Sequence, residues 1–245
     1  MISALRASGP SLDHFPLDDV DYRLMETEFE KEEIYRLRYR AYLHEGAIEP
    51  RADKRLKDRF DDLPNSWTFG VYIGGRLLSS IRISVAASLD DDTPAVDAFP
   101  DLLKPELAKG KVICDANRFV ADPDRDHRMT ELPYVTVRLG YMACAYFNAN
   151  IGTATVRAEH RAFYRRVFLV KPLCEPRPYP TLTKPLCLMA EDCDVVRYRI
   201  FERYPFFRSS LFERRKLFER SHLPSEPLAP VTLPEFPFAK ATVLP

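Results

Sequence analysis

Two segments rich in β-branched and aromatic residues, 67–73 and 77–86, flank a turn that contains Gly74 and Gly75. Adjacent glycines adopt the positive φ angles that a tight hairpin turn requires. The two segments are therefore predicted to form an antiparallel hairpin. Because a lone hairpin is marginally stable in water, further strands and helices must cover its apolar side chains. The hairpin thus fixes the centre of a larger sheet.

The remaining periodicities place more strands and helices around this hairpin. Further strands are predicted at residues 20–25, 111–120, 153–159 and 184–190. Helices are predicted from a Thr27–Glu30 capping box to about residue 45, from a Thr130 cap over 131–148, and at 161–168. The acidic, proline-containing residues 88–108 are expected to form an irregular excursion. This order predicts an α/β (α+β) fold, with a mixed, mostly antiparallel central sheet flanked by helices.

The pattern also suggests how the chain is divided. Residues 1–18 are expected to be a loose N-terminal segment, and residues 19–191 to form the folded domain. Residues 192–245 are expected to be an extension packed on that domain, with helices near 192–203 and 209–220 and a proline-rich tail from 222. Proline at this density prevents regular structure, so the tail is predicted to be extended.

Composition excludes several classes of function. Lys plus Arg and Asp plus Glu both total 36, so the chain lacks the basic excess typical of nucleic-acid binders. No apolar run approaches the roughly 20 residues that span a bilayer, so no integral membrane segment is expected. The five cysteines show no paired C-x-x-C spacing, which favours reduced thiols in a cytoplasmic protein. The histidines and cysteines form no ligand cluster, so no metal is expected.

Several charged residues stand where a purely structural core would not place them. Arg82 interrupts an apolar strand, and Asp115 and Arg118 lie near the end of the next strand. Arg38 lies on the first predicted helix, and Asp58 and Asp61 lie just before the hairpin. Burying any of these charges alone is costly, so they are predicted to pair in a cluster at one end of the sheet. The alternative is that they are ordinary surface charges.

The spacing of these residues resembles that of the acyl-homoserine-lactone (autoinducer) synthases. That family has an arginine and an aromatic four apart on its first helix, two aspartates three apart, an arginine on a strand, and an acidic residue three before an arginine and an aromatic. The matching residues are Arg38, Tyr42, Asp58, Asp61, Arg82, Asp115, Arg118 and Phe119. Ile48 and Leu56 stand where that family has tryptophan and glutamate.

The second half of the chain is similar to the long-chain N-acyl amino acid synthases, on residues 157–168 and 172–180. Both families belong to the N-acetyltransferase (GNAT) superfamily, so the resemblance implies a GNAT-like fold. The Phe163-Tyr164 pair resembles the late-helix tyrosine that serves as a general acid in that superfamily.

The resemblance implies roles for individual residues. Asp115 is expected to act as the catalytic base and Tyr164 to return a proton to the leaving thiol, with backbone N–H groups just past Val120 holding the thioester oxygen. The substrate site is expected to include Arg38, Tyr42, Asp58, Asp61, Arg82, Asn117, Arg118, Phe119 and His160. Structural alternatives stay open: an Asp115–Arg118 salt bridge, a core aromatic role for Tyr164 and a structural His160.

These roles fit an N-acyltransferase that moves a fatty acyl group to a small amine such as an amino acid. The donor is expected to be an acyl-carrier-protein phosphopantetheine thioester or acyl-CoA, with no permanently bound cofactor. Residues 121–131 contain no glycine, which disfavours a phosphate-binding loop for CoA and favours acyl carrier protein as partner. Two alternatives stay open: an autoinducer synthase that uses S-adenosylmethionine, and a non-catalytic acyl- or carrier-binding protein.

Overall fold

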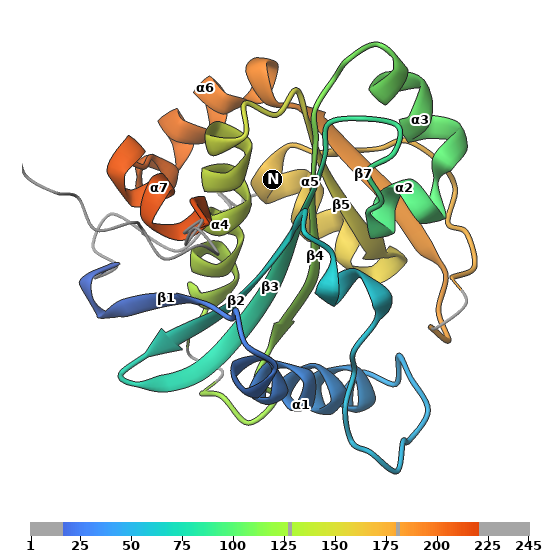
Figure 1. Ribbon diagram of the computed structural model, residues 1–245. Helices are drawn as coiled ribbons and strands as arrows, with labels where there is room; N and C mark the ends of the chain where they lie inside the picture. Colours follow the sequence, from blue (N-terminus) through green and yellow to red (C-terminus); the bar gives the residue numbers. More distant parts are fainter. Residues whose placement is uncertain (1–16, 127–128, 180–181, 221–245) are drawn as a thin grey trace, which may run out of the picture.

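The computed structural model describes residues 17–126, 129–179 and 182–220. Within these ranges the strands form one seven-stranded sheet in the order β1-β2-β3-β4-β5-β7-β6 (Figure 1). The β4–β5 pair is parallel and the other neighbours are antiparallel. The strands are β1 (Val20–Leu24), β2 (Ser66–Ile73), β3 (Arg76–Ala86), β4 (Ile113–Ala121), β5 (Ile151–Arg157), β6 (Lys171–Pro172) and β7 (Leu186–Asp192). The predicted mixed, mostly antiparallel sheet is therefore confirmed.

Helices cover both faces of this sheet (Figure 1). One face carries α4 (Leu132–Tyr146), α5 (Arg161–Phe168), α6 (Cys193–Arg203) and α7 (Leu211–Phe218). The other carries α1 (Glu28–His44), α2 (Pro94–Ala98) and α3 (Pro100–Ala108). Short 3-10 turns lie at η2 (Leu17–Asp19), η3 (Arg59–Asp62), η4 (Ala158–His160) and η5 (Pro205–Phe207). We call the two sides the α4 face and the α1 face.

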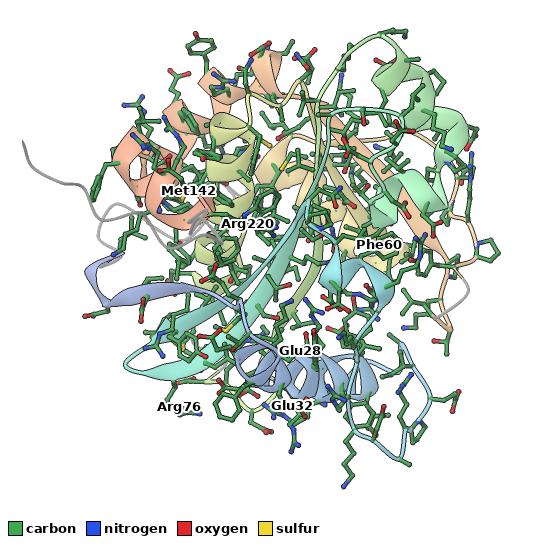
Figure 2. The ribbon with its side chains drawn as sticks, in the orientation of Figure 1. Glu28, Glu32, Phe60, Arg76, Met142 and Arg220 are labelled. Atoms are coloured by element: carbon green, nitrogen blue, oxygen red, sulfur yellow. The ribbon has the colours of Figure 1, made fainter. Side chains whose placement is uncertain are left out.

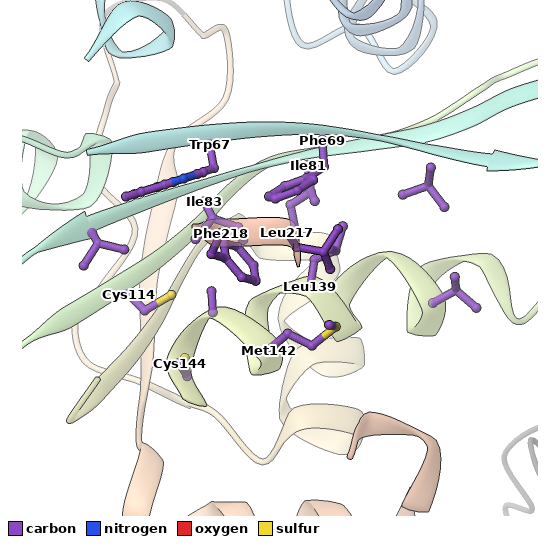
Figure 3. Packing of buried hydrophobic residues seen from close by; sticks show 14 of the residues in the cluster. Trp67, Phe69, Ile81, Ile83, Cys114, Leu139, Met142, Cys144, Leu217 and Phe218 are labelled. Carbon is purple, nitrogen blue, oxygen red and sulfur yellow. The ribbon is translucent and has the colours of Figure 1, made fainter. Parts of the chain in front are cut away.

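The main core lies between the hairpin and α4. Trp67 and Phe69 of β2 and Ile81 and Ile83 of β3 point toward α4, where they meet a stripe that includes Leu139 (Figure 3). Alternation along each strand sends these side chains to one face, as period-two patterning requires. Arg82, which lies between Ile81 and Ile83 on β3, is fully buried on the α1 face.

The start of α1 follows from its sequence. The Thr27 side chain accepts a hydrogen bond from the Glu30 backbone at 3.2 Å, and the Glu30 carboxylate accepts one from the Thr27 backbone at 2.9 Å. The predicted capping box is therefore present, and it satisfies N–H groups that a helix start leaves free. Glu28 and Glu32 of α1, labelled in Figure 2, form ion pairs with Lys57 and Arg36, whereas Arg38 is fully buried.

Two local predictions were wrong. Residues 88–108 contain α2 and α3, because Pro94 and Pro100 occupy first-turn positions where a helix needs no proline N–H. Thr130 does not cap α4; the N-cap position is Glu131, and the Thr130 hydroxyl donates to the Glu131 carboxylate at 3.1 Å.

An ion pair and hydrogen bonds join the C-terminal segment to α4. Buried Arg138 pairs with Glu213 of α7 at 2.6 Å and donates to the carbonyls of Phe206 and Arg208 at 2.7 and 2.9 Å. The helices predicted near 192–203 and 209–220 are therefore present as α6 and α7, while the proline-rich tail from 222 lies outside the described residues. Over the part of the chain that the structure describes, no helix is long and apolar enough to cross a bilayer.

Candidate active site

The centre of the sheet opens between β4 and β5. Their parallel pairing begins at Ile113 and Ile151 and ends at Ala116 and Ala154. Both strands continue past this point, β4 to Ala121 and β5 to Arg157. The two strands therefore diverge, and neither satisfies the other's backbone groups beyond the last pair. Unpaired backbone groups in such a gap are available to a bound ligand.

A β-bulge lies on β4 at the same level. Ser80 pairs with Val120 and Arg82 with Asn117, so Ile81 alone faces both Arg118 and Phe119. Arg118 has a φ of 51°, in the left-handed region that non-glycine residues seldom adopt. A bulge of this kind re-aims the side chains that follow it. Here it places Arg118 on the α1 face, next to Asn117, and returns Phe119 to the α4 face.

An apolar cavity lies on the α4 face, where β4 and β5 diverge. It is open to solvent on one side, spans about 500 Å³ with that opening included, and extends between β4, β5, α4 and α5. Its wall includes Ala116, Phe119, Gly140, Ala154, Tyr164 and Phe168. Gly140 is part of this wall, and a Cβ added there would make an ordinary van der Waals contact with the Ala116 side chain at 3.5 Å. A pocket with an apolar lining suits a hydrocarbon chain.

Two of the predicted site residues, Tyr164 and Tyr42, lie near the gap between β4 and β5. Tyr164 of α5 lines the cavity, and burial followed by the nearby Tyr42 raises its pKa above the ordinary value. Tyr42 comes from α1, on the other side of the sheet, and its ring lies 5.3 Å from the Arg118 guanidinium carbon. Tyr42 is therefore near enough to both Arg118 and Tyr164 to influence the site from the α1 face.

On the α1 face, the predicted charged residues form one buried cluster. Arg38 pairs with Asp61 at 2.7 Å, and Arg82 pairs with Asp58 at 2.6 Å and with Asp61 at 2.8 Å. Arg118 donates to Asp58 through Nε at 2.9 Å and Nη2 at 2.6 Å. The pairing prediction is therefore correct, and the surface-charge alternative does not hold for these residues.

The local fold of η3 presents both aspartates. Asp58 caps the turn by accepting from the Phe60 backbone at 3.0 Å, and the Asp61 carboxylate accepts from the Asp58 backbone at 3.0 Å. The buried Phe60 ring, labelled in Figure 2, lies 5.6 Å from the Arg82 guanidinium carbon. A reciprocal capping box therefore holds the two carboxylates three residues apart and aims both at the arginines.

Electrostatics keep this cluster ionised. Burial favours the neutral carboxyl of Asp58, but Arg82 and Arg118 outweigh it and hold the Asp58 pKa well below its usual range. Burial also opposes the charge on Asp61, where Arg38 and Arg82 again lower the pKa. For Arg38 burial prevails over Asp61, so the pKa of its guanidinium is lowered. Within the described residues, Arg38 Nε and Nη2 have no hydrogen-bond partner.

Asp115 lies on the same face but is not paired with Arg118. One carboxylate oxygen accepts from the Ala95 backbone of α2 at 2.9 Å, and the other from the Thr153 hydroxyl at 3.3 Å. Burial raises its pKa to about 6, although the Ala95 hydrogen bond acts in the opposite direction. The salt-bridge alternative for Asp115 is therefore wrong. Its neighbours Cys114 and Ala116 line the cavity, on the opposite side of the strand.

Asn117 connects Asp115 to the cluster. Its carbonyl oxygen accepts from Arg82 Nε at 2.8 Å, and its amide nitrogen donates to the Asp115 backbone carbonyl at 3.0 Å. His160 lies apart from this network, at the end of β5, with Nε2 3.2 Å from Arg157 Nη2. Burial, and then Arg157, lower the His160 pKa. Arg157 also pairs with Glu45, which ties the end of β5 to the end of α1.

Three residues of the site were not predicted from the sequence. Thr153 supports Asp115, and Tyr141 and Glu191 line the cavity from α4 and β7. One signal was present for Glu191: it falls on the same face of β7 as the buried Cys187 and Met189, where an apolar residue is expected. Among the described residues, no group of three or more His, Cys, Asp and Glu side chains is placed to hold a metal ion.

Comparison with known proteins identifies the family. A profile of the family described as N-acyl amino acid synthase FeeM matches residues 33–192. No curated protein sequence is significantly similar to this chain.

Solved structures share the fold. FeeM, an N-acyl amino acid synthase from uncultured soil microbes, superposes with a TM-score of 0.60 at 16% identity, covering 73% of this chain and 93% of FeeM. The CoA-dependent acyl-homoserine lactone synthase BjaI gives 0.51 at 19% identity over 71% and 82% of the chains. The acyl-homoserine lactone synthase LasI gives 0.53 at 11% identity over 70% and 89%. The chain has the GNAT-like fold, belongs to the FeeM family of N-acyl amino acid synthases and is an acyltransferase.

Proposed function

We propose that this chain transfers a fatty acyl group from a carrier-protein or coenzyme A thioester to the amine of an amino acid or a related metabolite. The observation that carries the proposal is the division of the site into two halves. An apolar cavity lies on the α4 face and an ionised arginine–aspartate cluster on the α1 face, with the open β4–β5 gap between them. One half suits a hydrocarbon chain and the other a charged acceptor.

The donor half supports binding of an acyl thioester. A fatty chain in the cavity would remove apolar surface from water, at about 25 cal/mol per Å². Its thioester carbonyl would then stand at the gap, beside the β4 bulge. The N–H groups that hold the thioester oxygen were expected just past Val120. Because the bulge lies before Val120, we propose instead that the backbone N–H groups at Arg118 and Phe119 donate to this oxygen, where negative charge develops in the transition state.

The acceptor half supports an amine that also carries an acidic group. Arg38, Arg82 and Arg118 bring three positive charges against the two negative charges of Asp58 and Asp61. A carboxylate can accept two parallel hydrogen bonds from a guanidinium group, and Arg38 Nε and Nη2 have no partner within the described residues. An amino acid provides both the carboxylate and the nucleophilic amine.

Proton transfers complete the proposed reaction. Asp115 takes the proton that the ammonium group loses, so that the amine lone pair attacks the thioester carbon and the C–N bond forms. Burial brings the Asp115 pKa to about 6, closer to that of an amine than an exposed aspartate is. As the C–S bond breaks, the Tyr164 hydroxyl gives its proton to the thiolate, a role supported by its place in the cavity wall. The attacking nitrogen then gives its second surplus proton to the Tyr164 oxygen, so the products are an amide, a free thiol and a protonated Asp115 that releases its proton to water.

The choice of donor belongs to the same proposal. Residues 121–131 contain no glycine to cradle a pyrophosphate, which favours acyl carrier protein over coenzyme A. Exposed Arg165 and Arg166 on α5 lie next to Tyr164 and suit an acidic carrier protein. We further propose a cytoplasmic enzyme in which residues 19–191 form the acyltransferase domain and 192–245 an extension of it.

The test is a product assay. Purified protein is incubated with acyl-carrier-protein and acyl-CoA donors, pooled amino acids and S-adenosylmethionine, and lipids are identified by mass spectrometry. An N-acyl amino acid is expected, at a rate reduced about 100-fold or more by Asp115→Asn. Asp101→Asn, which alters an exposed aspartate paired with Arg177, is the matched control and is expected to keep the rate.

The same assay decides between the proposal and its alternative. Ile48 and Leu56, where autoinducer synthases have tryptophan and glutamate, are both buried with Tyr39 in an apolar cluster. They therefore offer no polar contact to a sulfonium nucleoside. An acyl-homoserine lactone as the sole product would reject the amino acid acceptor, and no transfer from any donor would reject the proposed function.

A further inference from the structure

A carboxyl group stands at the inner end of the apolar cavity. Glu191 of β7 pairs with Gly152 of β5, and Gly152 pairs in turn with Cys114 of β4. This level is five residues along β4 from Phe119 at the bulge, or roughly 16 Å at the usual rise of a strand. A chain whose thioester lies at the bulge would therefore approach Glu191 with its distal part.

The sequence makes room for this carboxyl. Gly152 has no side chain, and a Cβ built there would lie 3.3 Å from both Cγ and Oε1 of Glu191. On the same face of β7 the preceding positions are the buried, apolar Cys187 and Met189. A polar residue at a core position, with a glycine opposite that provides space for it, indicates a binding site.

Glu191 and its neighbour Tyr141 have unused hydrogen-bonding capacity. Within the described residues, Glu191 Oε2 and the Tyr141 hydroxyl are buried without a hydrogen-bond partner. Both side chains line the cavity, and both also line a smaller cavity beneath α6. Burial raises the pKa of Glu191 to about 8, although the nearby Tyr141 hydroxyl acts in the opposite direction. At neutral pH the carboxyl is therefore mainly protonated and offers both a donor and an acceptor.

We propose that Glu191 and Tyr141 form a recognition site for a hydroxyl group on the distal part of the acyl chain. The preferred donor is then a hydroxylated fatty acyl thioester. A hydroxyl both donates and accepts, so it can satisfy the carboxyl and the phenol together. A plain methylene offers neither group a hydrogen bond, and sites built to bond a hydroxyl reject analogues that lack it. This inference rests on the proposed acyl-binding role of the cavity.

Binding of matched fatty acids tests the inference without turnover. Dodecanoic acid and its 12-, 11- and 10-hydroxy derivatives compete with a fluorescent fatty acid bound to the full-length protein. At least one hydroxylated chain is expected to bind about tenfold or more tightly than the plain chain. Glu191→Gln keeps a donor and an acceptor and should retain this preference, whereas Glu191→Leu should reverse it. Tyr141→Phe should weaken the preference, and thermal melting of each variant verifies folding.

The outcomes separate the two proposals. If plain and hydroxylated chains bind equally well, or if Glu191→Leu leaves the preference unchanged, the hydroxyl site is rejected while acyl binding stands. If no fatty acid displaces the probe and no donor is turned over, the proposed function itself fails and the hydroxyl site fails with it.

Discussion

Removing Asp58 tests whether the ion cluster holds the acceptor half together. Asp58 receives hydrogen bonds from Arg82 at 2.6 and 3.2 Å and from Arg118 at 2.9 and 2.6 Å. In Asp58→Ala, Arg82 keeps its contact with Asp61 at 2.8 Å, but Arg118 loses the carboxylate that neutralises it. Arg118 also has a strained backbone, with a φ of 51°, which this carboxylate helps to hold. Breaking a buried pair on one side costs about 3–5 kcal/mol.

Urea unfolding at pH 7 measures this cost, with Trp67 as the reporter because it is the single tryptophan and is buried in the core. Asp62→Ala is the matched control: it lies in the same turn, and its ion pair with Lys57 at 3.0 Å is largely exposed, so a loss below about 1 kcal/mol is expected. Because the Asp58 pKa lies below its usual range, the contribution is retained at mildly acidic pH and lost only under stronger acid. A loss for Asp58→Ala no larger than for Asp62→Ala would refute the reasoning.

Three more predictions follow from the cavity. Glu191 has a pKa raised to about 8, so the wild type loses stability as pH rises from about 4.5. Between pH 5 and pH 7, Glu191→Gln should therefore gain about 2–3 kcal/mol of unfolding free energy relative to the wild type in urea unfolding. Parallel pH profiles for the two proteins would contradict this. Gly140→Leu should fill the space beside Ala116 and shift donor preference toward shorter acyl chains in competition assays, and an unchanged chain-length profile would contradict this role of the cavity. Tyr164→Phe should lower kcat about 100-fold with little change in KM, whereas a loss confined to KM would assign the tyrosine to binding.

The hairpin and most of the helices and strands could be predicted from the sequence because they follow from local rules, and the pairing of the charges because burying them alone is costly. Glycine turns, the Thr27 capping box and period-two alternation act over a few residues. The alternation of side chains along one strand was enough to predict that Arg82 does not lie on the apolar face. Even the ends of α5 were correct, at Arg161 and Phe168.

The contacts of Asp115 could not be predicted in this way. Residues three apart on a regular strand point to opposite faces, so Asp115 and Arg118 share a face only because of the bulge. The partner that Asp115 uses, the Ala95 backbone, belongs to a segment that was expected to be irregular. Its helix α2 depends on Pro94 at the first turn, a position where proline favours a helix instead of breaking it.

A structure of the protein bound to a non-hydrolysable thioether of coenzyme A with a dodecyl chain would test the two-sided site most directly. The predicted result is a chain on the α4 face, along Ala116 and Gly140, with its sulfur at the gap between β4 and β5 and its end near Glu191. A chain lying on the α1 face, against Arg82 and Asp58, would contradict the division of the site into donor and acceptor halves.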